Sequence, residues 1–73
     1  MKEYRFTVVY EQDEEGRIVA VCPALQGCYA EGETAEEARA SILEAIQAHV
    51  ESRIAHGQPI NVEVKSEAVY LNF

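Results

Sequence analysis

The stretch from Cys22 to Ala38 carries the strongest local constraints in this 73-residue sequence. It contains both cysteines, one of the two prolines and two of the four glycines. Pro23 has no amide hydrogen, so a central β-strand cannot continue through it. Gly27 and Gly32 indicate sharp turns or bulges of the backbone. The stretch therefore predicts the end of one strand, a short second strand and then the start of a helix.

A capping box predicts where that helix begins. The Thr34 side chain can accept the amide of Glu37, and the Glu37 carboxylate can reach back to the amide of Thr34. Apolar residues then recur at steps of three and four, which predicts a helix over 35–55. This stripe consists of Ala35, Ala38, Ile42, Leu43, Ala45, Ile46, Val50 and Ile54. Gly57 and Pro59 predict its end.

Alternating side chains predict strands on both sides of the helix. Residues 4–11 place aromatic and β-branched side chains on one face, and residues 17–22 form a mostly apolar second strand. An acidic turn joins them, in which Gly16 suits a left-handed conformation. Residues 28–31 can form a short third strand, and residues 60–65 alternate again.

The order β-β-β-α-β indicates an α+β fold, with a small, mainly antiparallel sheet covered by one long helix. Residues 68–73 are largely apolar and should dock, either as a final strand on the chain's own sheet, which is the simpler arrangement, or on another chain by strand addition. No repeat, linker or low-complexity tract divides the sequence, so we expect one domain over residues 1–73.

The formal charge of −7 restricts the partners that the chain can bind. Phosphate backbones repel such a chain, so direct nucleic-acid binding is not expected. An acidic surface suits a basic protein partner, or it is solvated charge that keeps the chain soluble. No apolar run is long enough to span a membrane and no signal peptide is visible, so we expect a cytoplasmic protein without membrane contact.

The residues with chemical potential do not form a reactive site. Cys22 and Cys28 are too far apart in sequence for a zinc site with His49 and His56, and we expect free, packed cysteines. The histidines fall at the end of the helix, where cations are favoured. The acidic residues do not suggest a magnesium-binding cluster. We therefore expect no catalytic residue, no metal, no cofactor and no enzyme.

Three local patterns together resemble the HicB-like antitoxin family. They are an acidic hairpin turn with a glycine, a Cys-Pro-x-Leu-x-Gly-Cys loop and a Gly-x-Thr-x-Glu-Glu-Ala helix start. The matching residues are Gly16, Pro23, Leu25, Gly27, Cys28, Gly32, Thr34, Glu36, Glu37 and Ala38. The resemblance implies a fold similar to a reduced ribonuclease-H-like fold, a homodimer or higher oligomer, and inhibition of a small basic HicA-type toxin that cleaves messenger RNA. Many members continue into a DNA-binding segment; this sequence resembles the short form without one.

Two functional hypotheses follow. In the first, the chain is the interaction module of a type II toxin–antitoxin system and neutralises a HicA-type toxin. In the alternative, it is a stand-alone homo-oligomeric domain with a structural or ligand-binding role and no toxin partner. The acidic residues expected to bind the partner lie either at the hairpin tip or at the helix start, and apolar residues at the C-terminal end are further candidates. They are Glu11, Asp13, Glu14 and Glu15; or Glu31, Glu33, Glu36 and Glu37; and Val69, Tyr70, Leu71 and Phe73.

Overall fold

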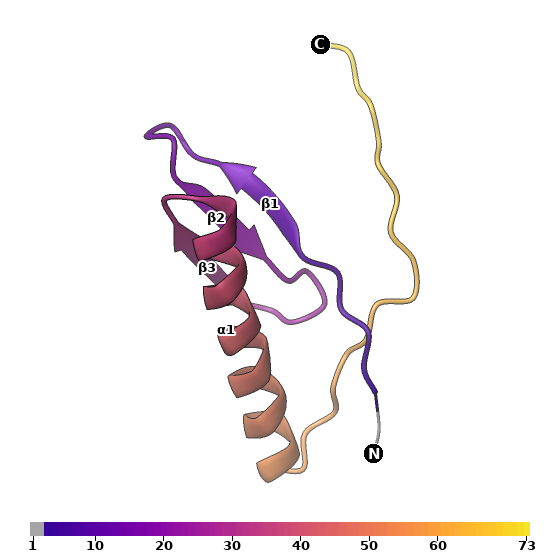
Figure 1. Cartoon of the computed structure of the whole chain (residues 1–73). Helices are drawn as coiled ribbons and strands as arrows, with labels where there is room; N and C mark the ends of the chain where they lie inside the picture. Colours follow the sequence, from indigo (N-terminus) through magenta and orange to yellow (C-terminus); the bar gives the residue numbers. More distant parts are fainter. Residues whose placement is uncertain (1–2) are drawn as a thin grey trace.

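The computed structural model describes residues 3–73. Strands β1 (Val9–Gln12), β2 (Ile18–Val21) and β3 (Tyr29–Gly32) form an antiparallel sheet in the order β1-β2-β3. Helix α1 (Ala35–Ala55) then crosses one face of the sheet, and its second half extends past the sheet (Figure 1). The predicted α+β class is confirmed, because a three-stranded antiparallel sheet is followed by one long helix.

The first strand is shorter than the alternation over residues 4–11 predicts. β1 begins only at Val9, which pairs with Val21, the last residue of β2. After Val21 the segment that follows β2 turns away from β1 at Pro23, so the residues before Val9 have no strand to pair with. Tyr4 and Phe6 still stack on each other with ring centroids 6.4 Å apart, and Phe6 packs against the core.

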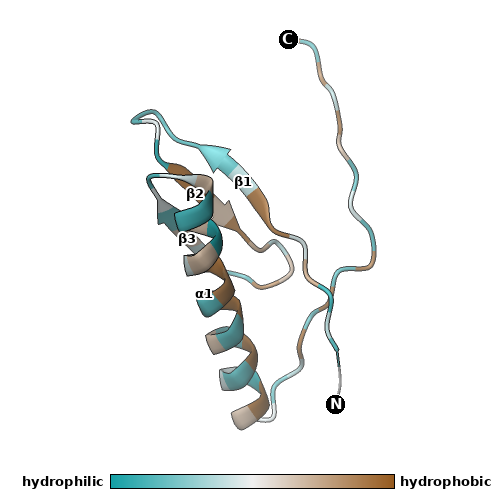
Figure 2. Cartoon of the chain, in the orientation of Figure 1, coloured by the Kyte–Doolittle hydropathy of each residue, from teal (hydrophilic) through white to brown (hydrophobic). Residues whose placement is uncertain are grey.

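The core lies between the sheet, the helix and the loop from Cys22 to Cys28. Its buried side chains are Ala20, Cys22, Leu25, Cys28, Ala38 and Ile42. The loop is closed by backbone bonds: the Cys22 amide donates to the Cys28 carbonyl (3.0 Å), and the Leu25 amide donates to the Cys22 carbonyl (3.1 Å). Leu25 thereby points inward at 1% exposure, so the loop supplies the largest side chains of the core together with Ile42. In Figure 2, residues of β2 and of several turns of α1 are coloured brown, so both layers that enclose the core carry apolar residues.

Both ends of the helix form as predicted, with one difference. The Glu37 amide donates to Thr34 Oγ1 (3.2 Å), which confirms Thr34 as the N-cap. The Glu37 carboxylate accepts from the amide of Glu33 (2.9 Å) and not from that of Thr34, because the extended N-cap backbone brings the preceding amide within its reach. At the other end the Gln58 amide donates to the Arg53 carbonyl (2.8 Å) across Gly57, which closes the last turn.

Gly32 has a different role from the turn or bulge predicted for it. Gly27 and Gly16 adopt positive φ angles of 79° and 87°, as expected in turns, whereas Gly32 does not. A Cβ at Gly32 would lie 2.6 Å from the Ala38 nitrogen and 2.7 Å from the Glu37 Cβ. The glycine is therefore required because β3 passes directly against the first turn of α1.

The strand expected over residues 60–65 is absent from the described chain, and residues 68–73 do not dock on the chain's own sheet. Residues 60–73, here called the tail, have no regular secondary structure. The tail crosses the N-terminal segment where Thr7 Oγ1 donates to the Glu63 carboxylate, and then runs away from β1 (Figure 1). Because the tail does not run beside a strand edge, its backbone has no neighbouring strand with which to form ladder hydrogen bonds.

Candidate partner-binding surfaces

The structure brings the two predicted acidic clusters to one end of the molecule. Since the three strands are antiparallel, the tip of the β1–β2 hairpin and the end of β3 lie at the same end, and α1 begins there too (Figure 1). Glu11 and Glu31 both pair with Val19 and lie roughly 10 Å apart, two strand spacings, on the face opposite the helix. We call this surface the acidic end; it comprises Glu11, Asp13, Glu14, Glu15, Glu31, Glu33, Glu36 and Glu37, all exposed.

Several of these carboxylates have structural partners. Asp13 Oδ1 accepts from the amides of Glu15 (3.0 Å) and Arg17 (2.9 Å), so this side chain organises the hairpin tip. Glu31 of β3 forms an ion pair with Arg17, the residue before β2, at 3.4 Å, and both side chains are about half exposed. Glu37 caps the helix start. The carboxylates of Glu14 and Glu15 at the tip are exposed and form no hydrogen bond or ion pair within the described residues, as is also true of Glu11, Glu33 and Glu36.

An apolar surface on the helix-free face of the sheet was missed by the sequence reasoning. Val9, Val21 and Tyr29 form one cross-strand row, and Tyr29 is 61% exposed. A shallow hollow next to this row is lined by Val19, Val21, Pro23 and Tyr29 among others. The mostly apolar run of β2 was the available signal, because both of its faces carry apolar side chains, while the single helix covers only one.

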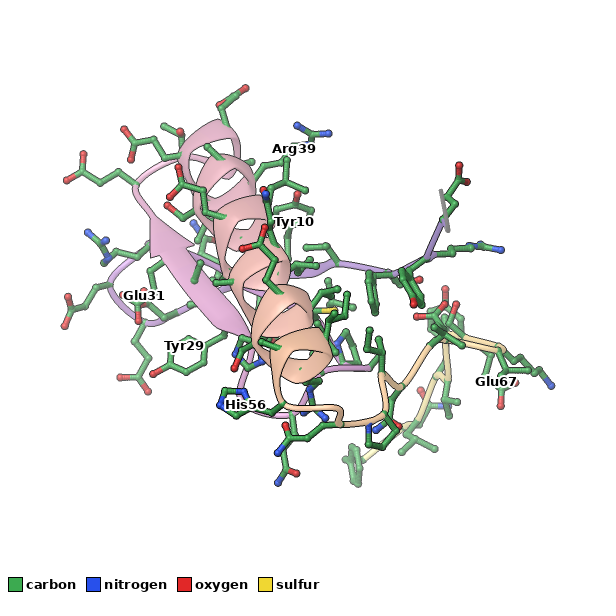
Figure 3. All side chains as sticks on the ribbon, turned by 90° about the horizontal axis from the view of Figure 1, so that it is seen from below. Tyr10, Tyr29, Glu31, Arg39, His56 and Glu67 are labelled. Carbon is green, nitrogen blue, oxygen red and sulfur yellow. The ribbon has the colours of Figure 1, made fainter. Side chains whose placement is uncertain are left out.

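The predicted apolar residues of the tail form a separate surface. Val69, Tyr70, Leu71 and Phe73 are all exposed. Figure 3 places Glu67 of the tail and Glu31 of the acidic end at opposite sides of the molecule. The predicted partner-binding residues thus divide into an acidic surface and an apolar surface that lie apart.

The two cysteines are unreactive core residues. Cys22 and Cys28 are free and buried. Burial raises the pKa of the Cys28 thiol, and the neighbouring Cys22 raises it further, so the neutral form is favoured. Within residues 3–73, no group of three or more His, Cys, Asp or Glu side chains is placed to hold a metal ion. No helix in this part of the chain is long and apolar enough to cross a membrane.

The fold and its surfaces define a small acidic α+β module built around a structural Cys-Pro-x-Leu-x-Gly-Cys loop. A family model, described as the HicB-like antitoxin of bacterial toxin–antitoxin systems, matches residues 6–72. The chain therefore belongs to the HicB-like antitoxin family, and the resemblance inferred from its motifs is confirmed.

Curated relatives are similar over most of their length. One UPF0150 protein of Synechocystis is 45% identical over 60 residues, which cover 82% of this chain and 76% of that protein. A UPF0150 protein of Thermoplasma acidophilum is 43% identical over 56 residues, covering 77% and 81% of the two chains. Another, of Archaeoglobus fulgidus, is 32% identical over 62 residues, covering 82% and 90%. No solved structure matches the chain significantly.

Proposed function

We propose that this chain is an antitoxin that acts by binding, and that it neutralises a small basic mRNA-cleaving toxin of the HicA type. Membership of the HicB-like antitoxin family over residues 6–72 is the observation that carries the proposal. The net charge of −7 supports a basic partner, because a protein that binds RNA needs a positively charged surface that an acidic protein can cover.

The acidic end is the surface that we assign to this partner. Its carboxylates converge from the hairpin tip, from β3 and from the first turn of α1, where like charges raise the local negative potential. Exposed charges at the rim of an interface mainly set the association rate and the choice of partner, whereas apolar groups supply most of the affinity. The apolar row of Val9, Val21 and Tyr29 continues from the acidic end along the same sheet face and can supply those groups.

Reversing two charges at the tip should weaken toxin binding. The variant Glu14→Lys, Glu15→Lys is expected to reduce the association rate at least tenfold at low salt, because both side chains face solvent and neither supports the fold. The measurement is co-expression with a small basic reading frame found beside this gene, read out by growth rescue, co-purification and binding kinetics.

The matched control reverses the same number of charges elsewhere. Glu44→Lys, Glu51→Lys changes exposed positions on the part of α1 away from the acidic end and should leave binding nearly unchanged. Equal effects of the two double variants would contradict the assignment of the acidic end. Failure of the parent chain to co-purify with the toxin or to rescue growth would contradict the antitoxin proposal itself.

The exposed tail favours self-association as a second candidate function, in which the chain is a homo-oligomeric domain with a structural or ligand-binding role. Truncation after Ser66 removes Val69, Tyr70, Leu71 and Phe73 and should convert an oligomer to a monomer in light scattering. A truncated chain that loses the oligomer but still binds toxin would show that the two surfaces act separately. A truncated chain that remains oligomeric would exclude this part of the tail from self-association.

A further inference from the structure

Two extended segments of the chain have an unpaired backbone. Residues 5–8 continue the outer edge of β1, and the tail follows α1. In the described chain, the backbone hydrogen bonds outside the helix and strands lie in turns and at the helix ends, and none involves residues 5–8 or the tail. Extended backbone with free donors and acceptors is a template for pairing with another strand.

The tail exposes several large apolar side chains to water, which is unfavourable. Val64 is 94% exposed and Tyr70 is 91% exposed, and Val69, Leu71 and Phe73 are exposed as well. Together these side chains offer roughly 500 Å² of apolar surface. The match to the family model extends to residue 72, so this segment belongs to the region that defines the family domain.

The tail does not use the edge of its own chain. The Thr7 side chain donates a hydrogen bond to the Glu63 carboxylate, and an open groove separates residues 61–66 from Thr7, Val9 and Pro23. Beyond this crossing the tail and β1 diverge (Figure 1). The outer edge over residues 5–12 is longer than the four-residue β3 at the opposite edge, so it is the better match in length for an extended tail.

We propose that two copies of this chain exchange their tails, so that residues 64–72 of each copy pair as a strand with the outer edge over residues 5–12 of the other. Each copy carries one donor segment and one acceptor edge, so the exchange is reciprocal and closes a two-fold dimer. Because the side chains of a strand alternate between two faces, about half of this apolar surface can be buried at once, roughly 500 Å² for the two tails. With a similar area from the edges that they cover, the interface reaches about 1,000 Å², the lower limit for a specific interface. This inference assigns a surface to the self-association proposed above and does not depend on toxin binding.

Light scattering on the full chain tests the dimer. The expected mass is twice 8.2 kDa. The variant Val64→Asp, Leu71→Asp should be monomeric, because it places charges where the apolar side chains pair. The matched control Gln58→Glu, Asn61→Asp adds the same charge at exposed polar positions outside residues 64–72 and should remain a dimer. A monomeric parent chain at millimolar concentration, or a dimer that the first variant leaves unchanged, would overturn the proposal.

Nuclear magnetic resonance on the unmodified chain tests the exchange itself and does not depend on the variants. In an equal mixture of isotope-labelled and unlabelled chains, contacts from the methyl groups of Val64, Val69 and Leu71 to residues 5–12 should be seen between molecules. Contacts found only within one molecule would overturn the proposal even if a dimer exists.

The salt dependence separates this proposal from the antitoxin proposal. Each copy carries a charge of −7, so repulsion opposes dimer formation and added salt should strengthen the dimer by screening. Added salt should weaken binding of the acidic end to a basic toxin, because it screens the attraction between opposite charges. A dimer that dissociates with rising salt would contradict exchange driven by apolar side chains, whatever the result for the toxin.

Discussion

Replacing Leu25 with alanine should unfold much of the protein under conditions in which the parent chain is folded. Leu25 is 1% exposed and shares the core with Ile42, Cys22 and Cys28. Removing a buried leucine side chain costs about 2–5 kcal/mol, since apolar contacts are lost and a cavity remains. A core of this size supplies roughly 3–5 kcal/mol in total, so the loss is comparable with the whole free energy of unfolding.

Urea denaturation followed by circular dichroism at 222 nm measures this effect. The control is Leu43→Ala, which makes the same chemical change on the helix at a position that is 45% exposed. The control should cost less than about 1 kcal/mol, because less apolar surface returns to water and alanine favours the helix. Similar losses for the two variants would show that the Cys22–Cys28 loop does not anchor the core.

Replacing Gly32 should cause the second largest loss of stability. The cause is steric overlap, which can be distinguished from the backbone strain expected at a turn glycine. The Cβ of Gly32→Ala would meet backbone atoms of Ala38 and Glu37 at 2.6–3.0 Å. Backbone cannot move aside as a flexible side chain can, so β3 and the first turn of α1 must separate. Overpacking of this kind costs about 1–3 kcal/mol.

The comparison with Gly27 makes the prediction specific. Gly27 has a φ of 79° and no atom within 4 Å of an added Cβ, so alanine there is strained by backbone conformation alone. Asparagine tolerates positive φ better than most residues. We therefore expect Gly27→Asn to be less damaging than Gly27→Ala, and Gly32→Asn to be more damaging than Gly32→Ala. Urea denaturation gives the free energy of unfolding of each variant. If asparagine and alanine rank in the same order at both positions, the close approach of β3 to α1 is contradicted.

The candidate partner surface was only partly predictable. Glu14 and Glu15 were predicted at a solvated tip and Glu36 at a helix start, and all are exposed. The two acidic clusters were predicted as alternatives, although the antiparallel strand order places them at one end of the molecule. The bare sheet face around Val21 and Tyr29 was not predicted, because a mostly apolar strand does not reveal which of its faces a helix will cover.

The sequence by itself determined the elements that depend on neighbouring residues. Helix α1 has the predicted bounds because Thr34 caps its start and the Gln58-to-Arg53 bond across Gly57 closes its end, and these contacts span only a few residues. The hairpin turn is local for the same reason, since the Asp13 carboxylate accepts from amides two and four residues away.

Only the tertiary structure decided what depends on distant partners. The ladder of β1 begins at Val9 because β2 ends at Val21, Gly32 is needed because α1 passes over it, and the tail is unpaired because it diverges from the chain's own sheet edge. The alternation of the tail is that of a strand, but a strand also needs a neighbour to accept and donate its hydrogen bonds. The sequence specifies the pattern of side chains, but the fold decides whether a strand edge is available for that segment to pair with.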